Sequence, residues 1–319
     1  MVSSTLLSAI GITVWTAVLV TAAPRAISHR HDYSYGRDRA HAIEISAHDD
    51  APVASCSDLH VRFDHHDAVV QSEERTITKA EAPTLRVNAE SNGGLQVEGS
   101  DNDAYSVTLC KAAEAGSDAE SVLGSIKMTF SNGELGVTGP SSHDRWTAHL
   151  LVKAPRGAAM ELHVNNGPMG LFHVDGSLKV RAVNGPITVR GCKGDLDLSA
   201  ENGPVSLEEN GGKQSVRTQN GPITIDLDGK NWSGAGLEAY ATNGPVTLRV
   251  PAGYQSGVVL ESDGNGPFSC RASVCNEGRK TWDEEHKRVE FGTGPTVIHV
   301  STVNGPVTRV LPLSMYGWS

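Results

Sequence analysis

Short runs of alternating hydrophobic and polar residues cover most of the chain, and a turn precedes many of them. After most Asn-Gly-Pro tripeptides the order is apolar, small, apolar, as in Ile187-Thr188-Val189. Strict alternation over a few residues is typical of a β-strand that buries one face. The pattern therefore predicts an all-β chain built from many short strands.

The Asn-Gly-Pro tripeptide occurs seven times, with gaps of 18, 18, 18, 23, 22 and 39 residues. A related phrase without Pro occurs at 92–94 and 132–134, so the pattern runs from about residue 85 to the end. Asn and Gly tolerate the left-handed backbone region, and Pro fixes φ without needing a ladder hydrogen bond, so each tripeptide predicts a turn. The turn residues are Asn166, Gly167, Asn184, Gly185, Asn202, Gly203, Asn220, Gly221, Asn243, Gly244, Asn265, Gly266, Asn304 and Gly305.

Residues 184–201 show what one repeat contains. Residues 187–189 and 196–200 alternate as strands, and a turn separates them. Neither strand can bury its apolar face alone, so successive repeats must stack, about 4.8 Å apart, to make a core. The left-handed hexapeptide helix needs an aliphatic residue every six positions, and Lys193 and Ser199 break that rule. We therefore expect a flattened single-stranded β-helix, or solenoid, with two short strands per coil of about 18 residues and Asn-Gly-Pro turns.

Stacking these repeats in register places similar residues in rows along the solenoid. Two apolar rows face inward, and the turn asparagines form a row that can hydrogen-bond along the axis, as stacked amides do. An outward charged row places opposite charges one coil apart, which helps to keep the register and contributes about 0–1 kcal/mol per exposed pair. The inward rows contain Met169, Ile187, Val205, Ile223, Val246 and Phe268, and Leu171, Val189, Leu207, Ile225, Leu248 and Cys270. The charged row contains Arg190, Glu208, Asp226, Arg249 and Arg271.

Composition narrows the functional classes. The 319 residues include 37 Asp and Glu against 27 Lys and Arg, which gives a formal net charge of −10. A nucleic-acid-binding surface needs clustered Lys and Arg, so this balance argues against a nucleic-acid partner. Aromatic residues make up only 5% of the chain and glycines number 34, which argues against the core of a compact α/β enzyme.

The N-terminal residues predict export. Residues 6–20 are uncharged but too few for a membrane span, which needs about 20, and they match the apolar region of a secretory signal peptide. Small residues follow at the spacing that suits cleavage after Ala22, so we expect residues 1–22 to be removed. Residues 23–55 are polar and rich in histidine and are expected to form a linker before a repeat domain at 56–319. We expect the mature chain to have no membrane span. The sequence leaves the oligomeric state open and favours a monomer.

The five cysteines suit an oxidising compartment if some of them pair. Two pairs can be drawn from five cysteines in 15 ways. We expect disulfides between Cys56 and Cys110 and between Cys270 and Cys275, which leaves Cys192 unpaired. A zinc site is not expected because no Cys-x2-Cys spacing exists.

Motifs for catalysis are weak or missing. Asp195 and Asp197 share the outer face of one strand about 7 Å apart, within the range of an inverting glycosidase pair. Lys179 and Ser215 occupy the positions next to Asp197 in the neighbouring coils, and nothing there suggests a cleft. The sequence lacks a Gly-x-Ser-x-Gly elbow, a phosphate loop and calcium-binding nonapeptides. We therefore expect a protein without catalytic residues, metal or cofactor.

The largest insertion in the repeat region spans residues 276–291. It carries Arg279, Lys280, Trp282, His286 and Arg288. Loops that break a repeat are where binding is usually found on repeat scaffolds, so these residues are our candidates for partner binding. A hairpin or lid that simply extends from the last coils is the alternative interpretation.

Several phrases together resemble a known family. They are 57–63 (SDLHVRF), 146–155 (WTAHLLVKAP), the serial Asn-Gly turns and 292–305 (GTGPTVIHVSTVNG). Over residues 57–310 the chain resembles the "putative adhesin", or toastrack-like, β-strand-repeat proteins of bacterial envelopes. The resemblance implies a β-solenoid outside the cytoplasm and no established catalytic residues.

These observations lead to two functional hypotheses. The first is an exported, envelope-associated structural or adhesive protein that binds a polymer or another surface protein. The second is a protein that binds or processes a cell-surface glycan. A long face without a groove would favour the first hypothesis, and carboxylates gathered in one groove would favour the second.

Overall fold

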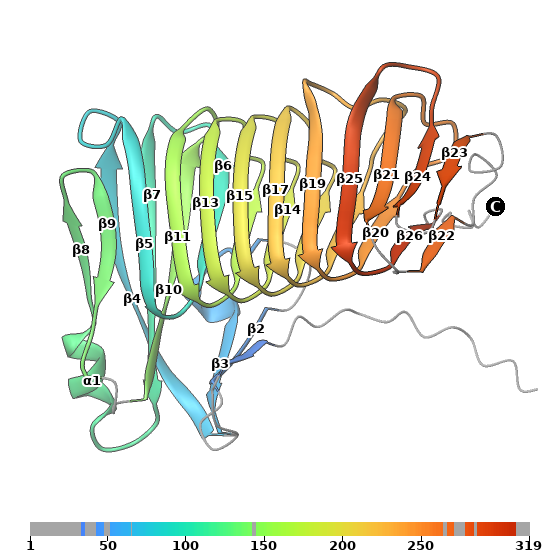
Figure 1. The fold of residues 1–319 in the computed structure, drawn as a ribbon. Helices are drawn as coiled ribbons and strands as arrows, with labels where there is room; N and C mark the ends of the chain where they lie inside the picture. Colours follow the sequence, from blue (N-terminus) through green and yellow to red (C-terminus); the bar gives the residue numbers. More distant parts are fainter. Residues whose placement is uncertain are drawn as a thin grey trace, which may run out of the picture.

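The computed structural model describes residues 33–35, 43–47, 52–64, 66–141, 145–263, 267–270, 278–283 and 286–310. Strands dominate these residues and form two large sheets, of 14 and 12 strands. Within the described part of the chain the helices are the short α1 (Ala119–Ser125) and one 3-10 turn, Cys56–Asp58. The expectation of an all-β chain is confirmed. The strands of the 12-stranded sheet lie side by side from β8 at one end to β23 at the other (Figure 1).

The spatial order of the strands in each sheet differs from their order along the chain. The 14-stranded sheet consists, in spatial order, of β1 (Tyr33–Tyr35), β2 (Ile43–Ala47), β3 (Leu59–Phe63), β4 (His66–Thr78), β7 (Ala104–Glu114), β10 (Trp146–Pro155), β6 (Leu95–Ser100), β12 (Met169–Phe172), β14 (Ile187–Arg190), β16 (Val205–Glu208), β18 (Ile223–Asp226), β20 (Val246–Arg249), β26 (Val307–Val310) and β22 (Phe268–Cys270). The 12-stranded sheet consists, in spatial order, of β23 (Arg279–Trp282), β24 (His286–Phe291), β21 (Gly257–Asp263), β25 (Thr296–Asn304), β19 (Gly236–Asn243), β17 (Lys213–Asn220), β15 (Asp195–Asn202), β13 (Ser177–Asn184), β11 (Ala159–Asn166), β5 (Thr84–Asn92), β9 (Glu134–Thr138) and β8 (Lys127–Ser131).

From β11 to β22 consecutive strands alternate between the two sheets. We call one strand of each sheet, with its turns, a coil. From β11 to β20, each strand pairs in parallel with its equivalent in the next coil, as Leu178 pairs with Leu196 and Ile187 with Val205. Because the repeat is in register, equivalent residues stack directly on one another, which is what the spacing of 18 residues predicts.

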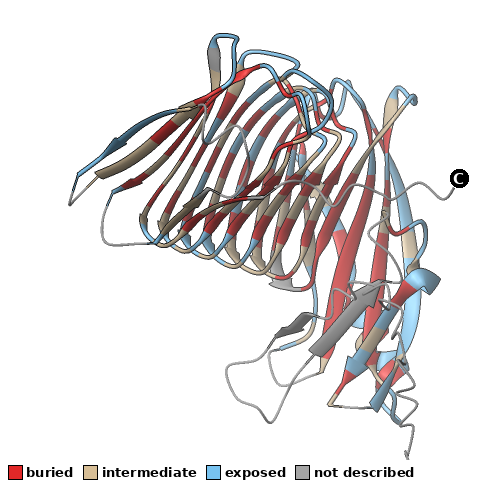
Figure 2. Ribbon diagram, turned by 90° about the vertical axis from the view of Figure 1, so that its right-hand side faces the viewer, coloured by how far each residue is buried: buried red, intermediate tan, exposed pale blue. Residues whose placement is uncertain are grey.

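The core lies between the two sheets. The inward positions of β12, β14, β16, β18 and β20 are at most 2% exposed, so the two apolar rows are confirmed over these strands. Buried positions form bands that cross successive strands (Figure 2). The outward charged row forms only in part. Arg190 Nε lies 3.7 Å from Glu208 Oε2 and Arg249 Nη1 lies 2.9 Å from Asp226 Oδ2, but Glu208 and Asp226 are like-charged neighbours. Arg271 lies outside the described residues, and Val310 is the neighbour of Arg249 in the next strand.

The Asn-Gly-Pro turns form a hydrogen-bonded ladder. Asn184, Asn202, Asn220, Asn243 and Asn304 each donate Nδ2 to Oδ1 of the asparagine one coil before, at 2.9 to 3.1 Å. The glycines let the coils approach closely. A Cβ on Gly203, whose φ is +131°, would lie 2.2 Å from the carbonyl oxygen of Gly185. Asn265 and Gly266 lie outside the described residues.

The last coils are not stacked in chain order. Strand β26 lies between β20 and β22, and β25 lies between β19 and β21. Phe268 therefore neighbours Val307 and not Val246, which corrects the order that we expected for the inward row. The hairpin β23–β24 explains the order: β24 occupies the far edge of β21, so the final coil enters on the other side.

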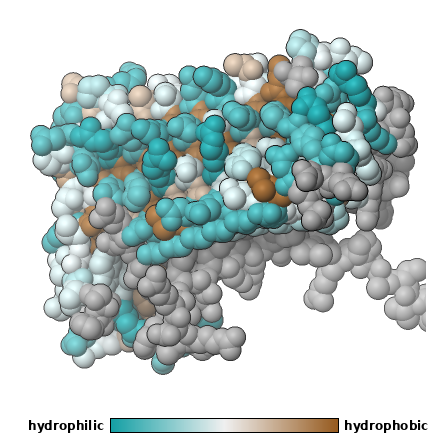
Figure 3. Space-filling view, viewed as in Figure 1, coloured by the Kyte–Doolittle hydropathy of each residue, from teal (hydrophilic) through white to brown (hydrophobic). Residues whose placement is uncertain are grey.

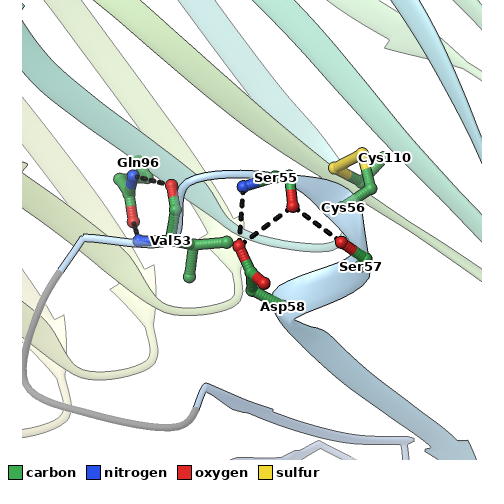
Figure 4. The surroundings of a disulfide bond; sticks show 7 residues. All are labelled: Val53, Ser55, Cys56, Ser57, Asp58, Gln96 and Cys110. Carbon is green, nitrogen blue, oxygen red and sulfur yellow. Dashed lines mark hydrogen bonds between the residues drawn. A yellow bond between two sulfur atoms is a disulfide. The ribbon is translucent and has the colours of Figure 1, made fainter.

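At the opposite end, the chain before the repeats packs on the outer face of the 14-stranded sheet. Val53 exchanges two hydrogen bonds with the Gln96 side chain, and a disulfide joins Cys56 to Cys110 (Figure 4). Strands β1 and β2 lie within the stretch expected to be a linker, and β2 pairs with β3. Residues 1–22, the expected signal peptide, lie outside the described residues.

Candidate functional site

The candidate binding residues lie on the hairpin of β23 and β24. The hairpin closes one end of the 12-stranded sheet, because β24 pairs with β21 and β23 is the last strand. Residues 276–277 and 284–285 of the expected insertion lie outside the described residues. The antiparallel pairing of β23 with β24 places Arg279 beside Glu290 and Trp282 beside Lys287.

Three of the five candidates are engaged within the protein. Arg279 Nε donates to Glu290 Oε2 at 3.0 Å, and Arg288 binds both Glu290 and Glu261. His286 Nδ1 lies 2.5 Å from Asp263 Oδ1. The pairs of Arg288 and His286 hold β24 against β21, and the pair of Arg279 joins β23 to β24. These three candidate residues therefore already have partners within the protein.

Glu261 is the centre of this charged cluster. Its side chain is only 13% exposed, and its carboxylate contacts both Arg288 and His299. The Nε2 atom of His299 lies 2.5 Å from Oε2 of Glu261. Burial raises the pKa of Glu261, but the hydrogen bonds and charges of His299 and Arg288 outweigh burial and hold that pKa below its ordinary value. The hydrogen bonds from Arg288 and Arg279 lower the pKa of Glu290 as well. Both carboxylates are therefore ionised at neutral pH.

Trp282 and Lys280 remain available to a partner. Both side chains are exposed, and 56% of Trp282 is open to solvent. The Trp282 ring lies 5.9 Å from that of Phe268, the first residue of the last strand in the other sheet. Trp282 and Phe268 therefore form an aromatic surface at the end where β23 and β22 are the edge strands of the two sheets.

The other candidate chemistry from the sequence forms no site. Asp195 and Asp197 are exposed on the outer face of β15, and Arg217 Nη1 lies 3.9 Å from Asp197 Oδ1. Among the described residues no group of three or more His, Cys, Asp and Glu is placed to hold a metal ion. In the same part of the chain no helix is long and apolar enough to cross a membrane.

The cysteines are placed as follows. Cys56 and Cys110 form the disulfide described above, and Cys192 is a buried free thiol whose pKa burial raises to about 11. The expected pair of Cys270 with Cys275 lies outside the part of the chain whose side chains are described.

The outer face of the 12-stranded sheet carries a groove that the sequence did not reveal. Two hollows, of about 240 and 480 Å³, adjoin across β5 and share Arg86, Asn88 and Glu134. We call them together the outer-face groove. It runs from β8 and β9 over β5 and β11 to β13, where Lys179 and Arg181 line it. The surrounding face is largely hydrophilic (Figure 3).

Charges alternate across the strands of this groove. Arg86 pairs in register with Glu134 on one side and Glu161 on the other, and Glu161 pairs with Lys179. Arg86 donates Nη2 to the carbonyl oxygen of Asn132 at 2.5 Å, and its Nε lies 4.0 Å from Glu134 Oε2. These internal contacts hold the Arg86 side chain in place where the groove crosses from β9 to β5.

No family model and no curated protein matches the sequence. Solved structures are similar in part. A "putative cell adhesion protein" of Clostridium sporogenes is 14% identical, with 76% of this chain and 100% of that chain covered and a TM-score of 0.33. A "putative adhesin" of Bacteroides fragilis is 8% identical over 76% and 97%, with a TM-score of 0.29. One of Parabacteroides merdae is 9% identical over 76% and 96%, with a TM-score of 0.31. These structures carry the family name that the sequence pattern suggested, and at such scores the likeness carries no argument about function.

The groove left only a faint trace in the sequence. Its lining comes from strands far apart in the chain, and Arg86 meets Glu134 and Glu161 only because β9, β5 and β11 are neighbours. The phrases at 92–94 and 132–134 marked two further turns, but not that β9 follows β5 in space. To predict the groove from the sequence, one would have needed to know how β9, β5 and β11 pair, and these strands lie before the regular Asn-Gly-Pro repeats.

Proposed function

We propose that the protein is an exported, envelope-associated structural or adhesive protein that acts by presenting a binding surface. Residues 1–22 serve as the signal peptide, residues 23–55 form a linker, and the repeats form a flattened solenoid with two strands per coil. The alternation of strands between two sheets and the parallel pairing of successive coils support the solenoid. The partner is an envelope polymer or a surface protein.

The observation that carries this proposal is the exposure of Trp282 beside Lys280 on an edge strand. Soluble proteins gain little by exposing a large aromatic side chain, and Trp is enriched at binding hot spots. The neighbouring basic residues fix the hairpin to β21, so this aromatic surface is held in a rigid position. A preformed surface loses less entropy on binding.

Co-sedimentation of the purified protein with isolated cell-envelope fractions and insoluble polysaccharides tests this proposal. We expect saturable binding that falls about tenfold or more in Trp282→Ala, the loss typical of a hot-spot side chain. Lys213→Ala is the matched control, because Lys213 is an exposed residue on β17 without an ion pair among the described residues. A folded protein that binds no fraction, or that binds equally well without Trp282, would overturn the proposal.

A second candidate function is the binding or processing of a cell-surface glycan. The observation that favours it is the outer-face groove, where the carboxylates of Glu134 and Glu161 line one continuous hollow. Processing would appear as reducing ends released from a polysaccharide by the protein and not by Glu161→Gln. Glycan binding alone requires no such release and is measured directly by titration.

A further inference from the structure

The outer-face groove has the length of a short oligosaccharide. It crosses five adjacent strands in the order β8, β9, β5, β11 and β13. With strands about 4.8 Å apart, this distance is about 19 Å. The groove runs across the strands, along the direction in which the coils stack, so an extended chain can lie in it without a bend.

The β8–β9 end of the groove contains neutral polar groups beside the paired Arg86 and Glu134. Thr129 and Ser131 supply hydroxyl groups, and Asn132 and Asn88 supply amides. Gly136 has no side chain at the outward position next to Asn88, and a Cβ there would lie 3.1 Å from Thr129 Oγ1. The missing side chain leaves space over a floor of donors and acceptors, which suits the hydroxyl groups of a sugar.

The β13 end is lined by cations. Lys179 and Arg181 are exposed, and neither has an ion pair among the described residues. Arg181 stands in register between His163 and Ser199, so no acidic residue is its direct neighbour across the strands. A guanidinium group in this position can bind a carboxylate through two parallel hydrogen bonds.

Two other arginines on this face already have acidic partners. Arg217 Nη1 lies 3.9 Å from Asp197 Oδ1 and its Nη2 lies 3.7 Å from Glu238 Oε2. Arg86 lies against Glu134, as described above. On β13, Lys179 stands in register between Glu161 and Asp197, so Arg181 is the cation of this groove that can meet an external anion without an acidic neighbour across the strands.

We propose that the outer-face groove binds an oligosaccharide that carries one carboxylate, such as a neutral sugar chain with a single uronic acid. The carboxylate lies between Lys179 and Arg181, and the sugar hydroxyl groups contact the amides and hydroxyls toward β8. The inference rests on the second candidate function, glycan binding, and names its ligand. It is independent of the hairpin surface at Trp282, which lies at the opposite end of the sheet.

Local charge argues against a densely charged polymer. Glu134 and Glu161 face the same groove as the two cations, and the whole chain has a net charge of −10. A polyphosphate or nucleic acid would place several negative groups against these carboxylates, which like-charge repulsion disfavours. A neutral sugar chain that carries a single carboxylate fits the mixed lining better.

Isothermal titration of the purified protein with xylo-oligosaccharides of about three to six units that each carry one glucuronic acid tests the inference. The methyl-esterified oligomers of the same length are the matched ligand control, because they lack only the negative charge. We expect binding of the acid and at least tenfold weaker binding of the ester, since a charge-assisted pair is lost. We also expect Lys179→Gln/Arg181→Gln to weaken binding of the acid about tenfold, whereas Lys213→Gln leaves it unchanged.

The outcomes separate this inference from the hairpin proposal. If the folded protein binds none of the acidic oligomers, or if the double variant binds them as tightly as the parent, the inference is wrong. Equal or tighter binding of a poly(glycerol phosphate) probe would also overturn it. Envelope binding that is lost in Trp282→Ala but kept in Lys179→Gln/Arg181→Gln would leave the hairpin proposal standing by itself.

Discussion

His149 is a titratable side chain placed where it cannot take up a proton without cost. It lies in β10, pairs in register with Cys110 and is only 7% exposed. Gly94 makes room for the ring, because a Cβ there would lie 2.4 Å from Nδ1 of His149. Its Nδ1 has no hydrogen-bond partner among the described residues, and burial lowers the pKa of His149 to about 4.

This burial predicts a loss of stability in mild acid. Between the ordinary histidine pKa of about 6.5 and the folded pKa of about 4, the unfolded chain binds a proton at His149 and the folded chain does not. Burial of the neutral ring therefore costs no stability through protonation above about pH 6.5. As the pH falls toward 4, proton binding to the unfolded chain lowers the free energy of unfolding by at most about 3 kcal/mol. Urea unfolding of the parent and of His149→Leu at several pH values measures it. We expect the difference between their unfolding free energies to change over this interval, and parallel pH curves would contradict the assignment.

Arg309 shows that the alternation of apolar and polar residues did not always predict which side chains face the core. Arg309 is in register with Leu248 and faces the core, at 1% exposure, where the coils before it place aliphatic residues. Its guanidinium lies 5.4 Å from the centre of the Phe291 ring, and burial lowers the pKa of Arg309. A charged residue in an alternating run is normally placed outward, so the sequence could not predict this inward position without knowing the neighbours of the last coil.

Among the structural elements, the Asn-Gly-Pro turn has the strongest effect on register. Asn202 donates its amide to Asn184 and accepts one from Asn220, both at 3.1 Å. The following Gly203 takes a φ of +131° and lies against the backbone of the preceding coil. The side-chain ladder and the backbone contact therefore act together at this repeat.

Two substitutions at this turn test its contribution. Asn202→Ala removes both ladder hydrogen bonds and should lower the unfolding free energy by about 1–3 kcal/mol, at about 0.5–1.5 kcal/mol for each bond. Gly203→Ala should destabilise further, because its Cβ would lie 2.2 Å from the Gly185 carbonyl oxygen. Denaturant midpoints measure both changes, with Glu201→Ala as the exposed neighbour control. If Asn202→Ala is no more destabilising than this control, the ladder does not stabilise the stack.

The turn also explains which elements the sequence could predict. Each repeat has its own turn and apolar triplet, so the strands at 187–189 and 196–200 and their pairing were predictable from spacing alone. The order of the last coils was not, because the coils that end in β20, β22 and β26 carry the same turn phrase and offer similar edges. The antiparallel pairing of β24 with β21 decides between them, and no local pattern records it.

On the scale of the molecule, the insertion of the last coil gives the two sheets unequal ends. Strand β25, although close to the C-terminus, has β19 on one side and β21 on the other. Strand β23 is at the edge and has only β24 beside it. The two candidate surfaces lie at opposite ends of the 12-stranded sheet. The hairpin is at the β23 end, and the outer-face groove lies near β8.

Hydrogen exchange followed by mass spectrometry tests this arrangement. Amides in β25 should exchange as slowly as those in β17, because both strands are hydrogen-bonded to neighbours on two sides, whereas β23 should exchange much faster. Strand β26 provides a second test of the same coil, since it lies between β20 and β22 in the other sheet. Fast exchange in β25 and β26, with β21 protected, would mean that β21 pairs directly with β19 and that the last coil is peripheral. Slow exchange in both would mean that the chain places its final coil inside the stack, so the hairpin that carries Trp282 forms the outer end of the molecule.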